Sequence, residues 1–168
     1  MNAYQIFQQI DPDLATQIFT FLRKDEKETY QGVIATLAEQ RKLRPVFILK
    51  KTPADQVTWL CKMARMKMAT GIDEHVLQMW LLKQQRDLLT DFLDAMEIKH
   101  DGEGSVDNLP DELDADKLAA AVDQLIGKHP QENVKIYLHV FQMQKINGWP
   151  TLGALLENDE RLHFSTAD

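Results

Sequence analysis

The stretch LATQIFTFL, residues 14–22, has large apolar side chains at intervals i, i+4, i+7 and i+8, counted from Leu14. This spacing places all four on one face of an α-helix. Asp11 and Pro12 come directly before the stretch and are typical of an N-cap and a first helical residue. The stretch therefore predicts an amphipathic helix that packs one face against a core.

The same period continues along the chain. We expect a helix to begin after Thr52-Pro53 and to end at Gly71, and another to begin at Asp73 as its N-cap. Two segments are also compatible with strands. For the short apolar run 46–49 we leave both strand and helix as alternatives. For 134–140, apolar residues on the opposite face favour a helix.

Three anchors, Leu22, Leu81 and Ile126, are each followed by apolar residues eleven, twelve and fifteen positions later. This register predicts three antiparallel helix pairs, although any helix pair with a short link would produce it. We therefore expect an all-α fold, a single domain over 1–168 with six to eight helices in consecutive antiparallel hairpins, as a bundle or a short solenoid. The expected core residues are Ile18, Leu22, Ile34, Leu37, Leu77, Leu81, Phe92, Leu93, Val122, Ile126, Leu138 and Phe141.

Composition is that of an ordinary globular protein, with 44% hydrophobic and 27% charged residues in 168. The single cysteine, Cys61, excludes an intramolecular disulfide and is typical of a reducing compartment. Apolar neighbours suggest that its thiol is buried and inert. No signal peptide or membrane-length apolar run is visible, so we expect a cytoplasmic protein without a membrane partner.

Charge is strongly segregated. Residues 41–67 contain eight basic side chains and one acidic one, in a chain whose net charge is −7. Residues 101–116 contain seven acidic side chains and no basic one. Such segregation favours partners of opposite charge.

The predicted helix after Pro53 is apolar on two sides. Such a helix is either buried between layers or offers an interaction surface. Aromatic and methionine side chains edged by basic ones are typical of interface hot spots. The expected partner-binding residues are Arg44, Lys50, Lys51, Trp59, Lys62, Met63, Arg65 and Met66. Self-association through the aromatic and methionine side chains is a variant of this hypothesis.

Chemistry-bearing motifs are scarce. The five histidines are scattered without zinc-ligand spacing, and no phosphate-binding or nucleophile motif is present, so we identify no catalytic residue and expect no cofactor. The acidic loop offers one weak alternative, calcium, through oxygen ligands at EF-hand positions: Asp101, Glu103, Ser105, Asp107 and Glu112. Val106 occupies the position that needs glycine, which favours a plain acidic turn.

The leading hypothesis is a non-catalytic protein-interaction or regulatory module. The alternative is a small-molecule-binding protein or enzyme with a pocket between helix pairs. A third possibility is nucleic-acid binding through 41–67, against which the acidic pI of about 5.2 argues.

Overall fold

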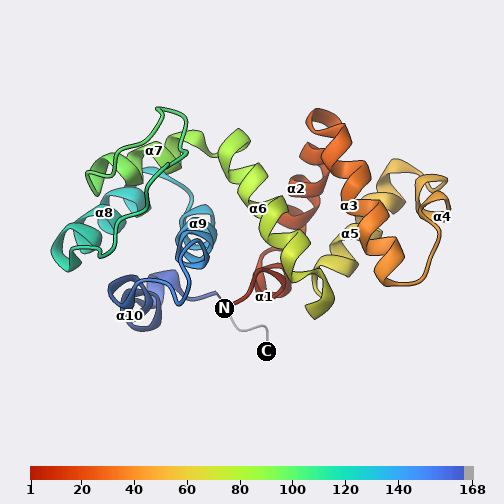
Figure 1. The fold of residues 1–168 in the computed structure, drawn as a ribbon. Helices are drawn as coiled ribbons and strands as arrows, with labels where there is room; N and C mark the ends of the chain where they lie inside the picture. Colours follow the sequence, from red (N-terminus) through yellow and green to blue (C-terminus); the bar gives the residue numbers. More distant parts are fainter. Residues whose placement is uncertain (165–168) are drawn as a thin grey trace. The chain divides into compact units, whose positions relative to one another are not determined.

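The computed structural model describes residues 1–164, and within them the chain forms ten α-helices and two short 3-10 helices with no β-strand (Figure 1). The all-α prediction is confirmed, with more helices than the six to eight expected. The unexpected elements are the first helix and a five-residue helix over the apolar run 46–49. The order is α1 (Ala3–Gln9), α2 (Pro12–Asp25), α3 (Lys27–Gln40), α4 (Pro45–Leu49), α5 (Pro53–Ala64), η1 (Lys67–Ala69), α6 (Thr70–Gln84), α7 (Arg86–Ala95), α8 (Ala115–Lys128), α9 (Gln131–Met143), α10 (Pro150–Asn158) and η2 (Glu160–Leu162).

The chain divides into two compact units, Met1–Trp80 and Leu81–Asp168, with the boundary inside α6. Of the three helix pairs expected from the repeat, α2/α3 and α8/α9 pack against each other. The third pair, α6/α7, spans the boundary between the two units and stays a prediction. The charge segregation follows the boundary between the units. The first unit has eleven basic and nine acidic residues, a net +2, and the second has eight and seventeen, a net −9. A single domain over 1–168 stays a prediction.

The first unit is built around α2, which packs against both α3 and α5, while α1 packs against α5. Its core includes Ile18, Leu22 and Leu37, all fully buried. The helix starts predicted at Asp11-Pro12 and at Thr52-Pro53 are confirmed. The Asp11 carboxylate accepts a hydrogen bond from the backbone N–H of Asp13, and the Thr52 hydroxyl accepts one from that of Asp55.

The second unit is organised by aromatic packing. The Phe92 ring lies edge-on to Phe141, with centroids 5.1 Å apart, and Phe141 stacks on the buried Trp149 at 4.8 Å. The indole N–H of Trp149 donates to the carbonyl of Pro110, which ties the acidic loop to the core. Gly148 precedes this indole with φ of +64°, and a Cβ there would come within 2.3 Å of the Gln142 amide. A larger residue would therefore strain the backbone and displace Gln142 from its bonds to Trp149.

Three local expectations are wrong. Gly71 does not end a helix, because α5 already ends at Ala64 and Gly71 lies within α6. Asp73 is not a solvent-facing N-cap, because α6 begins earlier, at Thr70, and the Asp73 side chain is buried. Ile126 is only half-buried, since the preceding Leu125 takes the core position on α8. The other eleven expected core residues are buried.

Candidate interaction surface and groove

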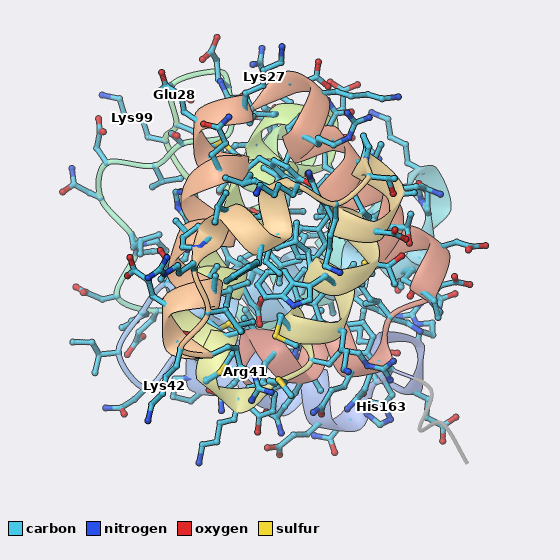
Figure 2. The ribbon with its side chains drawn as sticks, turned by 90° about the vertical axis from the view of Figure 1, so that its right-hand side faces the viewer. Lys27, Glu28, Arg41, Lys42, Lys99 and His163 are labelled. Atoms are coloured by element: carbon cyan, nitrogen blue, oxygen red, sulfur yellow. The ribbon has the colours of Figure 1, made fainter. Side chains whose placement is uncertain are left out.

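A short basic and apolar surface surrounds α4, and we name it the α4 patch. Its apolar members are exposed, and Phe47 is the most exposed of them at 60%. Its basic members are likewise exposed. Figure 2 shows Arg41 and Lys42 at the end of α3, away from Lys27 and Glu28 at its start. The full set is Arg41, Lys42, Leu43, Arg44, Val46, Phe47, Leu49, Lys50 and Lys51.

The end of α3 directs the chain into this patch. Lys42 has φ of +55°, a left-handed conformation, and its N–H donates to the carbonyl of Glu39. The N–H of Leu43 donates to Ala38 at 2.8 Å. These two bonds form a Schellman motif, which stops the helix and turns the chain. Pro45 then begins α4 as its first residue.

The buried side of α4 is fixed by packing and by hydrogen bonds from α5. Ile48 is the buried residue of the helix. Gln56 of α5, also buried, donates hydrogen bonds from Nε2 to the carbonyls of Leu49 and Lys51, at 3.1 and 3.0 Å. Its Oε1 accepts the hydroxyl proton of Tyr30 from α3, at 2.8 Å. The exposed apolar side chains are therefore presented by a fixed segment.

The positive charge of the stretch is not neutralised locally. Within residues 1–164, none of the eight basic side chains of 41–67 lies in an ion pair. Monomeric proteins seldom leave grouped apolar side chains exposed without a binding role. Unpaired cations around exposed apolar side chains suit an acidic, partly apolar partner.

The structure divides the sequence-predicted partner residues into three groups. Arg44, Lys50 and Lys51 belong to the α4 patch. Met63 is 3% exposed and belongs to the core, because the buried side of α5 is broad enough to include it. The remaining members lie elsewhere on or just beyond α5, with exposed or half-buried side chains: Trp59, Lys62, Arg65 and Met66. The sequence did not lead us to predict that the apolar residues of the α4 patch are exposed. The shortness of the run 46–49 and the preceding Pro45 could have indicated a short surface helix.

A second feature of the same unit is a groove formed by α1, α2 and α5. A cavity of about 340 Å³ lies there, lined by Phe7, Ile10, Pro12, Ala15, Thr16, Thr58, Cys61, Lys62 and Arg65. A neighbouring cavity of about 420 Å³ shares Thr16 and Thr58 with it and continues past Ala54 and Val57 to Arg23. The two cavities adjoin at Thr16 and Thr58, and we name them together the α2–α5 groove.

Two basic side chains lie at one end of the groove, Lys62 in the last turn of α5 and Arg65 directly after the helix. Arg65 is fixed by reciprocal hydrogen bonds with the end of α1. Gln8 Nε2 donates to the Arg65 carbonyl at 2.8 Å, and Arg65 Nη2 donates to the Gln8 carbonyl at 3.4 Å. Lys62 lies one turn earlier and is exposed. This end of the groove is therefore cationic, while its walls are largely apolar.

Cys61 lines the groove and is half-buried rather than enclosed in the core. Its Sγ lies 3.9 Å from Oγ1 of Thr16 on α2. Burial raises the pKa of the thiol, and the contact with Thr16 partly opposes this. A thiol with a raised pKa is a poor nucleophile at neutral pH, so nothing here indicates cysteine chemistry.

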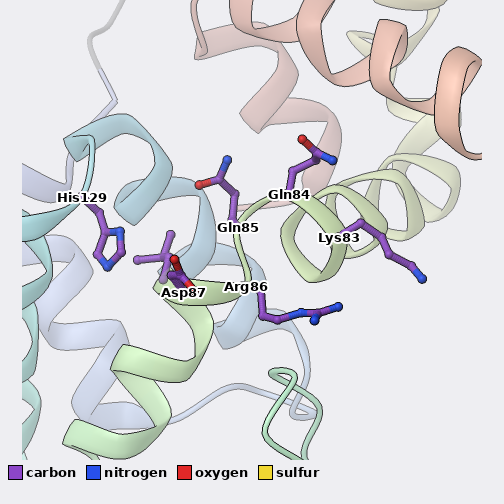
Figure 3. Close-up of a pocket in the computed structure, with 7 residues that line it drawn as sticks. Lys83, Gln84, Gln85, Arg86, Asp87 and His129 are labelled. Atoms are coloured by element: carbon purple, nitrogen blue, oxygen red, sulfur yellow. The ribbon is translucent and has the colours of Figure 1, made fainter.

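The second unit has a polar pocket of about 240 Å³ at the break between α6 and α7 (Figure 3). His129 lines it, and His129 Nε2 lies 2.7 Å from the Asp91 carboxylate, which also pairs with Lys128 at 2.8 Å. In Figure 3 the side chains of Lys83 and Arg86 point away from His129. The basic groups therefore do not converge on one position, as phosphate binding or catalysis would require.

Hydrogen bonds within the acidic loop hold its first turn. The Asp101 carboxylate accepts hydrogen bonds from the N–H groups of Glu103 and Ser105, which hold the pKa of Asp101 below its ordinary value. Glu103 lies 3.7 Å from Arg86. In residues 1–164 no cluster of three or more His, Cys, Asp or Glu side chains is placed to hold a metal ion. The five calcium candidates are thus not brought together as a ligand set.

Asp73 is the most unusual polar group of the first unit. Its side chain has no exposed surface, and neither carboxylate oxygen has a hydrogen-bond partner. The hydroxyl of Thr70, three residues earlier on α6, is also buried and unpaired. Burial raises the pKa of Asp73 to about 9, so its carboxyl is protonated at neutral pH.

Comparisons with protein-family models, curated proteins and solved structures find no match for this chain. Within residues 1–164, no helix combines the length and apolarity needed to cross a membrane. The α4 patch and the α2–α5 groove are therefore the features from which a function can be inferred.

Proposed function

We propose that this chain is a non-catalytic protein-interaction module of the cytosol, and that its α4 patch binds an acidic, partly apolar segment of a partner protein. The observation that carries the proposal is the exposure of Phe47, at 60%, among five basic side chains without ion pairs. Aromatic residues and arginine are enriched at protein interfaces, and Phe47 has Arg41 and Arg44 in the same patch.

Each part of the patch implies a property of the partner. Phe47 and its apolar neighbours need a partner surface that excludes water from them. The five basic residues favour carboxylates at the rim of that surface, which raise the association rate and set the orientation. The Gln56 bonds already fix α4 in the free protein, so little conformational entropy is lost when the partner binds.

A protein partner fits better than the other macromolecules. The unit that contains the patch has a net charge of only +2, far below that of a typical nucleic-acid-binding domain. At five residues, α4 offers too little apolar surface for an interfacial membrane helix. The apolar centre with a cationic rim is instead the arrangement found at protein interfaces.

The test is site-specific photo-crosslinking in cells, with a photoreactive phenylalanine analogue at position 47. The matched control places it at Ile146, which is 90% exposed and lies in the acidic unit. We expect position 47 to yield a discrete protein adduct that position 146 does not, with an acidic segment at the linkage. The purified segment should then bind the purified chain, about tenfold or more weaker for Phe47→Ser.

Charge is tested separately by Lys50→Glu combined with Lys51→Glu, which should lower the association rate and its salt dependence. The proposal fails if position 47 captures only lipid or nucleic acid. It also fails if positions 47 and 146 give the same adducts.

A further inference from the structure

We propose that the α2–α5 groove binds a small single-chain carboxylate, with the carboxylate between Lys62 and Arg65 and the alkyl chain lying toward Ala54. This site is separate from the α4 patch and does not depend on the function proposed for it.

Charge argues for the anionic head. Neither Lys62 nor Arg65 has an ion-pair partner within residues 1–164. The reciprocal bonds with Gln8 restrain Arg65 and leave most of its guanidinium donors free. A planar guanidinium binds a carboxylate through two parallel hydrogen bonds, and an adjacent ammonium adds a further charge-assisted one.

The groove walls argue for an apolar chain. Phe7, Ile10 and Ala15 line the cationic end. Pro53, Ala54 and Val57 line the continuation, together with the side chains of Thr16, Thr20, Thr58 and Arg23. Along α5 the distance from Arg65 to Ala54 is about 16 Å, since a helix rises about 1.5 Å per residue. The two cavities, of about 340 and 420 Å³, leave room for an alkyl chain along this length.

Cys61 provides a direct measurement, because it is the single cysteine of the chain and lines the groove. A bound alkyl chain would cover its thiol. The experiment measures the rate of Cys61 alkylation by iodoacetamide above neutral pH, with octanoate, decanoate or dodecanoate, and with uncharged 1-decanol for comparison. Covering is expected to slow alkylation, and the concentration dependence of the slowing gives the dissociation constant.

We expect decanoate to protect Cys61 with a dissociation constant about tenfold or more below that of 1-decanol, because charge-assisted hydrogen bonds hold the head. Each added methylene should tighten binding by roughly two- to fourfold as the chain extends along the groove. Equal protection by decanoate and 1-decanol would overturn the proposal, as would the absence of protection at about 1 mM decanoate, the weak limit for a specific site.

Variants locate the head. Arg65→Gln and Lys62→Gln should each weaken decanoate about tenfold while leaving 1-decanol unchanged. Arg44→Gln and Lys51→Gln remove the same charge from the α4 patch and should leave both ligands unchanged. If the α4 variants weaken decanoate as much as the groove variants do, net charge rather than the groove is responsible, and the proposal is wrong.

Discussion

The Tyr30 hydroxyl donates a 2.8 Å hydrogen bond to Oε1 of Gln56, and both side chains are buried. This bond joins α3 to α5. Nε2 of the same Gln56 side chain donates to the carbonyls of Leu49 and Lys51, at the end of α4. The rigidity of the α4 patch therefore depends on one amide whose donors and acceptor are all used.

Tyr30→Phe should lower the free energy of unfolding by about 1–2 kcal/mol, because Oε1 of Gln56 is left buried and unpaired. Denaturant unfolding measures the loss, and hydrogen exchange should show faster opening around residues 49–51. Thr36→Val is the control, since its hydroxyl bonds only to the Gly32 carbonyl within α3. If both variants lower the free energy of unfolding by similar amounts, the Tyr30–Gln56 bond contributes no more to stability than the Thr36 bond within α3.

Lys42→Gly should stabilise the protein by about 0.5–1 kcal/mol. The φ of +55° at Lys42 strains any residue with a Cβ, and glycine relieves that strain. Thermal unfolding measures the gain. Gln40→Gly, two residues earlier within the right-handed helix, should destabilise by about 0.5–1 kcal/mol, so the two variants should differ in sign. A loss at both positions would argue against the Schellman geometry.

Asp73→Asn should remove a pH-dependent cost of folding. Burial raises the pKa of Asp73 from 3.8 to about 9, so the folded state retains a proton that the unfolded state releases. The free energy of unfolding of the native chain should thus fall as pH rises from about 4 to about 9, by up to about 1.4 kcal/mol per unit. The variant should lack this slope.

Urea denaturation at several pH values between 5 and 8 measures the difference between Asp73→Asn and the native chain. We expect it to grow by about 3–4 kcal/mol over this range in favour of the variant. Asp55→Asn, which removes an exposed carboxylate from the same unit, is the control. Parallel pH profiles for Asp73→Asn and the native chain would contradict the buried, protonated carboxyl.

His139 should produce the opposite trend at acid pH. Burial lowers the pKa of His139 from 6.5 to about 4, so the unfolded state takes up a proton first. Stability attributable to this group should be lost as pH falls from 6.5 toward 4, by on the order of 2–3 kcal/mol. His139→Gln should flatten that part of the profile, while His75→Gln, an exposed control, should not. If the His139→Gln variant loses stability between pH 6.5 and 4 as the native chain does, His139 is not the cause of that loss.

Much of the fold could be predicted from local pattern. Apolar spacing identified the amphipathic helices, and Asp11-Pro12 and Thr52-Pro53 marked two of their starts. These signals are local because capping and amphipathicity depend on residues within one or two turns. The basic stretch 41–67 is likewise visible by counting charges along the chain, since a count needs no knowledge of packing.

Only the tertiary structure decided which side of each helix is covered. Met63 and Asp73 are buried and Phe47 is exposed, because burial depends on which neighbouring helices pack against a residue rather than on its own apolarity. The α2–α5 groove is a product of the same packing, since it forms where α5 lies beside α1 and α2, which come much earlier in the chain. The sequence by itself thus determined the long amphipathic helices and the charge distribution, and packing determined which side chains remain available for binding.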